Sequence, residues 1–318
     1  MKDIKQILFF AAISTIVISC STKKDTVINR NYHALTTKYN ILFNGKEAFK
    51  KGIEEVNSNY QDDYWKQLPI EPIAFDEDKV VVPTFSPIAN SGNSEKEEKK
   101  ELTTFDKAED KAVKAIQKHE MKIDGLERNR QIDDAYLLLG KSRYYSQRFI
   151  PAIEAFNYVI ANYPNANLIA ETKIWRAKAN IRIDNEERAI ESMNLLLVVR
   201  DSLEANLPDE TKEQGHTAMA MAYVKLDSVQ KVKEHLLKAT RTLKNREQSA
   251  RNLFILGQIY SQENKKDSAV LVFDKLSKFK KAPRKYRIHA NIALAKNFSK
   301  DSSSVALIER MQKLIEDR

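Results

Sequence analysis

The sequence predicts an all-α fold: a tetratricopeptide-like α-solenoid of about five helix hairpins, preceded by a helical segment and a charged linker. Three observations predict it. Glycine is scarce, with seven residues in 318, which disfavours sheets and phosphate-binding loops. Alanine, leucine, lysine and glutamate fill the second half of the chain, and all four are good helix formers. Small residues also recur there at a nearly constant interval.

Residues 1–19 are predicted to form a lipoprotein signal peptide. A short charged start precedes thirteen uncharged residues, Ile7 to Ser19. Because a transmembrane helix needs about 20 apolar residues, this run fits the apolar core of a signal peptide better. The single cysteine of the chain, Cys20, follows directly after an aliphatic and a small residue. That order resembles a bacterial lipobox and predicts that Cys20 is acylated and becomes the mature N-terminus.

Acylation at Cys20 predicts that the protein is anchored to a membrane. Several acyl chains together hold a protein firmly on a bilayer, whereas one chain binds only marginally. A serine follows the cysteine, which favours the outer over the inner membrane, and no acidic run follows, which favours the periplasmic face. We therefore expect an outer-membrane lipoprotein that faces the periplasm.

Residues 20–75 are predicted to form a lipid-anchored helical motif. Apolar residues recur at helical spacing between positions 29 and 45, and the helix is expected to continue to about Tyr60. Two prolines, Pro69 and Pro72, then predict an extended path.

Residues 76–102 are predicted to form a flexible linker. The stretch from Asn90 to Lys100 is polar and highly charged, a composition that cannot bury enough apolar surface to fold. Three valines near its start, Val80 to Val82, are expected to form a short strand or an extended piece. Helix is expected to resume near Thr103, which with Asp106 can cap it.

Residues 103–318 are predicted to form the solenoid. A tetratricopeptide unit has about 34 residues in two antiparallel helices with small residues where they cross. Tyr136 to Pro164 matches such a unit. The crossing positions follow at separations of 37, 43, 37 and 37 residues: Ala152, Ala189, Val232, Ala269 and Ala306. Since no hairpin buries its apolar face alone, the stacked hairpins should share one core; an unrelated helical bundle with fortuitous alanines is the alternative.

The composition and the motifs argue against most other functions. The net charge is +9, but cations and acids are interleaved and no nucleic-acid recognition motif occurs, so no nucleic-acid partner is expected. None of the five histidines stands at metal-binding spacing from another ligand, and no phosphate-binding or nucleophile motif occurs. We expect no metal, no cofactor and no enzyme activity. The one enzymatic alternative is Glu191-Ser192, which faintly resembles the Glu-Ser pair of lytic transglycosylases.

Binding is the function that remains. In solenoids of this kind the first helix of each hairpin lines the concave face. The residues expected there are Lys141, Tyr144, Lys178, Arg182, Lys225, Arg251 and Gln258. This mildly basic lining would suit an acidic or extended peptide, and ordinary solvated positions are the alternative for each residue.

A family resemblance sharpens this expectation. The lipobox, residues 30–49 (RNYHALTTKYNILFNGKEAF) and residues 132–140 (IDDAYLLLG) together resemble the PorW/SprE lipoproteins of Bacteroidota. The resemblance implies a tetratricopeptide protein of the type IX secretion system, required for motility in gliding species, with other secretion-system or envelope proteins as partners. It also implies further repeats beyond Arg318, and it supplies no catalytic residue. The alternative is a nutrient-binding lipoprotein similar to the SusD-like glycan binders. Those usually present exposed tryptophans, whereas this chain has only Trp65 and Trp175, and Trp175 is predicted to lie within a repeat helix.

Overall fold

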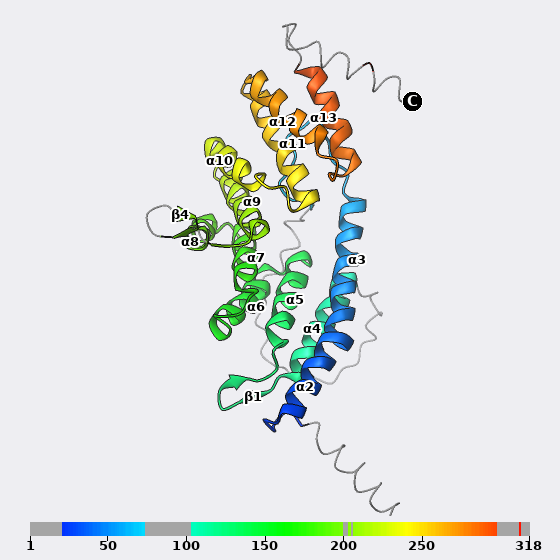
Figure 1. Cartoon of the computed structure of the whole chain (residues 1–318), viewed down its shortest axis with the longest axis vertical. Coiled ribbons are helices and arrows are strands. Elements are labelled where there is room, and N and C mark those ends of the chain that lie inside the picture. Colours follow the sequence, from blue (N-terminus) through cyan, green and yellow to red (C-terminus); the bar gives the residue numbers. More distant parts are fainter. Residues whose placement is uncertain (1–20, 74–102, 200–202, 205, 298–311, 313–318) are drawn as a thin grey trace, which may run out of the picture. The chain divides into compact units, whose positions relative to one another are not determined.

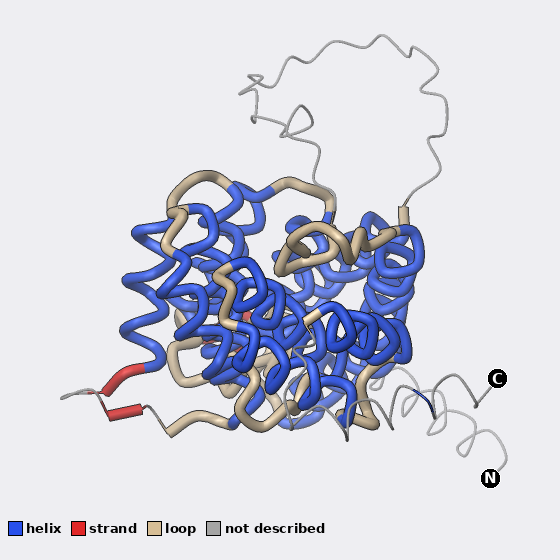
Figure 2. Tube along the Cα trace, turned by 90° about the horizontal axis from the view of Figure 1, so that it is seen from above, coloured by secondary structure: helices blue, strands red, loops and turns tan. Residues whose placement is uncertain are grey.

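The computed structural model describes residues 21–73, 103–199, 203–204, 206–297 and residue 312. Within these residues the fold is all-α and solenoid-like, as predicted. Figure 2 shows helix through most of the described residues, and the strands described form two short antiparallel pairs. The predicted signal peptide (1–19), Cys20, the predicted linker (76–102) and the last crossing position, Ala306, all lie outside the described residues.

The chain divides into two compact units. They comprise Met1–Asn59 with Phe75–Ala179, and Tyr60–Ala74 with Asn180–Arg318. The predicted organisation was different, with 20–75 as one region and 103–318 as another. The first of these regions is divided after Asn59, because helix ends there and the chain becomes extended. The solenoid is divided within helix α7.

Unit 1 contains the N-terminal helices and the first strong repeat. Its elements are α2 (Val27–Leu35), η1 (Thr36–Leu42, π-helical), α3 (Phe43–Asn59), α4 (Thr104–His119), β1 (Lys122–Ile123), β2 (Leu126–Glu127), α5 (Ile132–Tyr145), α6 (Phe149–Asn162) and most of α7 (Ile169–Arg182). The helices α2, η1 and α3 follow one another without a break (Figure 1). At the start of α4, Thr103 and Asp106 form the expected capping box.

The core of unit 1 joins the N-terminal helices to the first repeat. Ile41 and Leu42 of η1 pack with Ala112 of α4 and with Leu138 of α5. The N-terminal motif is therefore part of the same packed body as the first hairpin. Among the described residues, no helix is long and apolar enough to cross a membrane.

Unit 2 contains the later hairpins. Its elements are the end of α7, α8 (Glu186–Leu197), β3 (Val198–Val199), β4 (Leu203–Glu204), α9 (Asp209–Lys225), α10 (Val229–Ala239), α11 (Arg246–Gln262), α12 (Lys266–Lys278) and α13 (Arg284–Lys296). Each of α9 to α12 packs on the next helix along the chain. The β3–β4 hairpin is inserted between α8 and α9, which accounts for the one interval of 43 residues.

The four described hairpins share one turn. The crossing residues Ala152, Ala189, Val232 and Ala269 are at most 3% exposed. A non-glycine residue with positive φ lies five positions before each: Gln147, Asp184, Asp227 and Asn264. The next residue donates its N–H to a carbonyl five positions earlier, as from Arg148 to Arg143 and from Lys265 to Tyr260. The predicted register is thus confirmed for these four hairpins. The geometry of their turns, a positive φ followed by a hydrogen bond back to the first helix, could not be predicted from the spacing.

Close helix contact explains the glycine of the repeat. A Cβ on Gly140 would lie 2.3 Å from a ring carbon of Phe156, and one on Gly257 would lie 2.6 Å from Phe273. In both hairpins the glycine on the first helix receives the phenylalanine of the second. No other residue leaves enough room for the ring at this distance.

Candidate functional site

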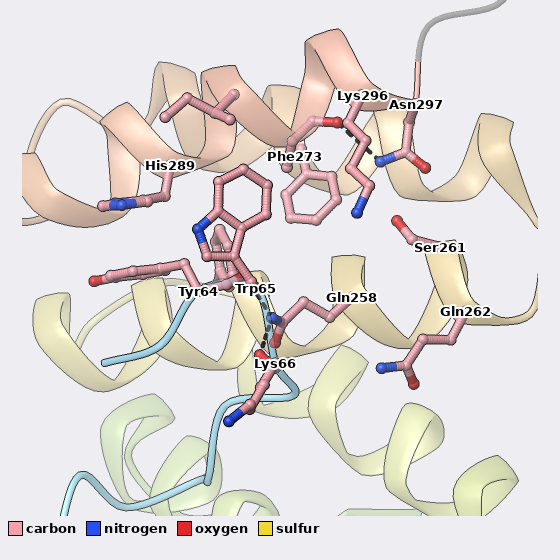
Figure 3. Close-up of a pocket in the computed structure, with 13 residues that line it drawn as sticks. Tyr64, Trp65, Lys66, Gln258, Ser261, Gln262, Phe273, His289, Lys296 and Asn297 are labelled. Atoms are coloured by element: carbon pink, nitrogen blue, oxygen red, sulfur yellow. Dashed lines mark hydrogen bonds between the residues drawn. The ribbon is translucent and has the colours of Figure 1, made fainter. Parts of the chain in front are cut away.

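An extended segment, residues 60–73, lies against the helices of unit 2. It has no regular secondary structure, and Figure 3 shows its path across α11, with α13 on the far side of the cavity. Its two prolines hold the backbone out of the helical region. Leu68 and Ile70 are 3% and 6% exposed, so the segment is anchored on the helices by these two side chains.

Two glutamine side chains of α11 bind the main chain of the extended segment. Gln258 donates its amide N–H to the carbonyl of Lys66 at 2.6 Å and accepts the N–H of Leu68 at 3.0 Å. Gln248 donates to the carbonyl of Ile70 at 2.9 Å. Since these bonds engage backbone groups, they require an extended peptide rather than particular side chains.

A buried ion pair fixes the start of the extended segment. Arg251 of α11 contacts both carboxylate oxygens of Asp62 at 2.7 Å, and it donates to the carbonyl of Pro69 at 2.9 Å. The side chains of Arg251 and Asp62 are 1% and 3% exposed. Lys285 of α13 approaches the same carboxylate at 3.8 Å. A charge pair this deeply buried is costly to break, because loss of one partner leaves the other charge buried and unpaired.

A second ion pair holds the far end. Arg182, at the end of α7, lies 2.6 Å from the carboxylate of Glu71, whose side chain is 5% exposed. Basic groups of the helices therefore receive acidic groups of the extended segment at both ends. Burial, assisted by the negative charge of Asp62, raises the pKa of the Tyr64 hydroxyl, which keeps this phenol neutral.

Beside the extended segment an open cavity of about 250 Å³ remains. Figure 3 shows Trp65 standing over it, with Phe273 and Lys296 on the other side. Trp65 is 75% exposed, and the Lys296 ammonium lies 5.7 Å from its ring centroid. Tyr64 stacks on His289 at 3.6 Å between ring centroids. The residues that line this cavity include two lysines and no carboxylate.

The predicted concave-face residues have three outcomes. Arg182, Arg251 and Gln258 all contact the extended segment, as shown above. Lys225 forms ion pairs on the surface with Asp184 and with Glu186. The other three residues belong to unit 1.

In unit 1 the predicted surface is largely enclosed. Tyr144 is fully buried among aromatic rings that include Trp175, so the prediction that it faces a partner is wrong. Lys141 lies 2.8 Å from Glu171 and 5.3 Å from the ring of Phe49. Lys178 lies 4.6 Å from the ring of Trp175.

The side chains of Gln248, Arg251 and Gln258 that hold the extended segment form a peptide-binding groove. The sequence did not reveal what occupies this groove. We expected an acidic or extended peptide as a ligand, and the chain itself supplies one at residues 60–73. A signal was present: acidic residues, Asp62 and Asp63, followed by aromatic residues and spaced prolines. Gln248, which binds this segment, was also missed, because nothing distinguishes it locally from a solvated helix residue.

Two histidine pairs were also missed. The Nδ1 atoms of His33 and His119 lie 2.8 Å apart, and those of His216 and His235 lie 3.0 Å apart. Burial lowers the pKa of His119, and it lowers that of His235 to about 4. Within the described ranges no group of three or more potential ligands is placed to hold a metal ion, so these pairs are contacts between helices. These pairs could not be predicted from residue spacing, because the paired histidines are 86 and 19 positions apart in the sequence.

We find no match to this chain among models of protein families or among curated proteins.

Proposed function

We propose that this protein is a lipid-anchored scaffold that binds other proteins and catalyses no reaction. The observation that carries the proposal is the recognition of an extended peptide by unit 2. Gln248 and Gln258 engage its backbone while Arg182 and Arg251 engage its acidic side chains. This combination of main-chain and charge contacts is how peptide-binding grooves work in general.

The proposed location is the periplasmic face of the outer membrane, with Cys20 as the attachment point. Its support is the lipobox pattern in the sequence. Mass spectrometry of the N-terminal peptide tests this point: we expect an acylated Cys20 as the first mature residue, and an unmodified cysteine would exclude the anchor.

The proposed system is the type IX secretion and gliding machinery. Its support is the resemblance of residues 30–49 and 132–140 to the PorW/SprE lipoproteins. The partners would be other secretion-system or envelope proteins. Deletion of the gene should abolish secretion and, in a gliding species, movement; a deletion strain that still secretes and glides would refute this assignment.

A matched pair of variants tests the scaffold at the groove. Trp65 is exposed beside the open cavity, and exposed tryptophans carry much of the binding energy at protein interfaces. Trp65→Ala should release the other secretion subunits when the acylated protein is purified from detergent-solubilised envelopes. Lys231→Ala, at an exposed position on α10, should retain them. Equal recovery with both variants would place the interface elsewhere.

The alternative of a nutrient-binding lipoprotein is favoured by one observation. Trp65 is exposed beside a cavity, and an exposed tryptophan is what we would expect of a glycan binder similar to the SusD-like proteins. In a Trp175→Phe background, Trp65 is the sole tryptophan and its fluorescence reports the cavity. A saturable change with oligosaccharides, and none with acidic peptides, would favour the glycan binder.

The enzymatic alternative has less support. Glu191 lies exposed on α8, outside the cavity described above. A muropeptide-release assay compares the chain with Glu191→Gln: we expect no release from either, and release that depends on Glu191 would contradict the proposal.

A further inference from the structure

The N-terminal helices of unit 1 present an apolar stripe to solvent. Five large side chains are between 46% and 71% exposed: Ile28, Tyr32, Leu35, Tyr39 and Phe43. They follow one another at steps of four, three, four and four residues, which places them on one face of a helix. The π-helical turns of η1 contain more residues each, so the last two steps of four remain on that face.

The opposite face of these helices is firmly packed. Asn29, His33, Thr37 and Ile41 are all buried. His33 contacts His119, as described, and the Thr37 hydroxyl accepts a hydrogen bond from Asn129 at 3.0 Å. The stripe is thus a fixed outer surface of a packed helix, and its exposure does not come from a loose chain end.

Cations outnumber carboxylates along the stripe, five to two between residues 21 and 47. From Thr26 to Lys46 the sequence contains three cations and no carboxylate. Lys23, Lys24 and Lys38 are exposed. Asp25 pairs with Arg30 and Arg128, and Asp134 pairs with Lys46, whereas Glu47, four positions after Phe43, is exposed. The surface therefore combines apolar and tyrosine side chains with uncompensated positive charge.

We propose that this stripe lies on the bilayer surface and binds anionic phospholipid. Apolar side chains with tyrosines and lysines around them are the composition of interfacial helices. Each exposed lysine adds attraction to an anionic surface. A partner protein would need a groove complementary in shape to all five side chains. A bilayer needs no such complementarity and requires only an apolar face with positive charge around it.

The position of Cys20 favours the bilayer as the occupant. Val27 follows Cys20 by seven positions, a distance of at most about 25 Å even when fully extended. An acyl group on Cys20 therefore keeps the stripe close to lipid. This step rests on the proposed acylation, but the lipid affinity of the stripe itself does not and can be measured without acyl chains.

Flotation with vesicles tests the stripe alone. The probe is vesicles of phosphatidylethanolamine and phosphatidylglycerol, with phosphatidylcholine vesicles for comparison. The protein is the chain from residue 20 onward with Cys20→Ser, which removes the acyl chains but keeps every described residue. We expect it to float with the anionic vesicles and to float less with phosphatidylcholine.

Matched variants decide the result. Leu35→Glu with Tyr39→Glu should lower the vesicle partition about tenfold or more, equivalent to about 1.4 kcal/mol or more. Leu271→Glu, at a position 72% exposed on α12, makes a similar change outside the stripe and should leave the partition unchanged. Circular dichroism confirms that all variants keep their helices.

Two outcomes overturn the inference. One is equal flotation of the double variant and the parent chain. The other is no flotation of either, together with loss of an envelope protein from purifications of the double variant, which would make the stripe a protein-docking face. In both cases acylation of Cys20 and the Trp65 experiment still test the proposed function separately.

Discussion

The two units cover the first helices of their hairpins in different ways. In unit 1 the covering element is helix α3, whose Phe49 packs on Phe105 and Tyr145. In unit 2 it is the extended segment of residues 60–73, held by Gln248, Arg251 and Gln258. A helix satisfies its own backbone and contributes apolar area. An extended chain must find partners for its backbone, and the side chains that supply them form a peptide-binding groove.

The largest expected effect is on the buried ion pair of unit 2. Asp62→Ala leaves the Arg251 guanidinium buried without its counter-charge, and we expect the free energy of unfolding to fall by about 3–5 kcal/mol. Urea denaturation followed by Trp65 fluorescence in a Trp175→Phe background measures it. A loss below about 1 kcal/mol would show that the groove does not depend on this pair.

The corresponding change in unit 1 is Phe49→Ala. Phe49 is partly buried, so we expect a loss of about 2–3 kcal/mol, less than the 3–5 kcal/mol of a fully buried phenylalanine. Trp175 fluorescence in a Trp65→Phe background reports unit 1. If Phe49→Ala in a Trp175→Phe background also weakens the transition that Trp65 reports, the two units do not unfold separately.

A third prediction concerns the glycine that both units share in their hairpins. Gly257→Ala places a methyl group 2.6 Å from the Phe273 ring and should cost about 1–3 kcal/mol through overpacking. Gly140→Ala should act in the same way on unit 1. The double variant Gly257→Ala with Phe273→Leu should recover part of the stability, and failure to recover would point to backbone rather than ring contact as the cause.

The fourth prediction concerns pH. Because burial lowers the pKa of His235 from 6.5 to about 4, the unfolded chain binds a proton that the folded chain does not between these values. The stability of unit 2 should therefore be complete above pH 6.5 and fall as the pH falls toward 4. His235→Gln should flatten the curve in that window, measured by denaturation at a series of pH values.

The smallest effect is expected at Lys225. Its ion pairs with Asp184 and Glu186 lie at the surface, where such pairs contribute less than about 1 kcal/mol. Lys225→Ala should leave both transitions nearly unchanged. A large loss would mean that Lys225 contributes more to the stability of unit 2 than its surface ion pairs indicate.

The helices and their register were predictable because they depend on local pattern. Ala152 and Ala269 mark their hairpins by size and spacing alone, and Thr103 with Asp106 marks the start of α4. Tyr144 was assigned to the wrong surface, since helical periodicity does not tell which side another element will cover. Arg251 was assigned to the right face, but its partner was not identified, because Asp62 is 189 residues away.

That separation has a consequence for the order of folding. A chain made from its N-terminus exposes Asp62 and the residues after it long before α11 exists to receive them. During synthesis the aromatic and apolar side chains of this stretch are in contact with solvent or chaperones until α11 forms. A truncated product that ends before Arg251 would expose the apolar side chains and unpaired backbone groups of residues 60–73. We expect such products to aggregate or to be degraded.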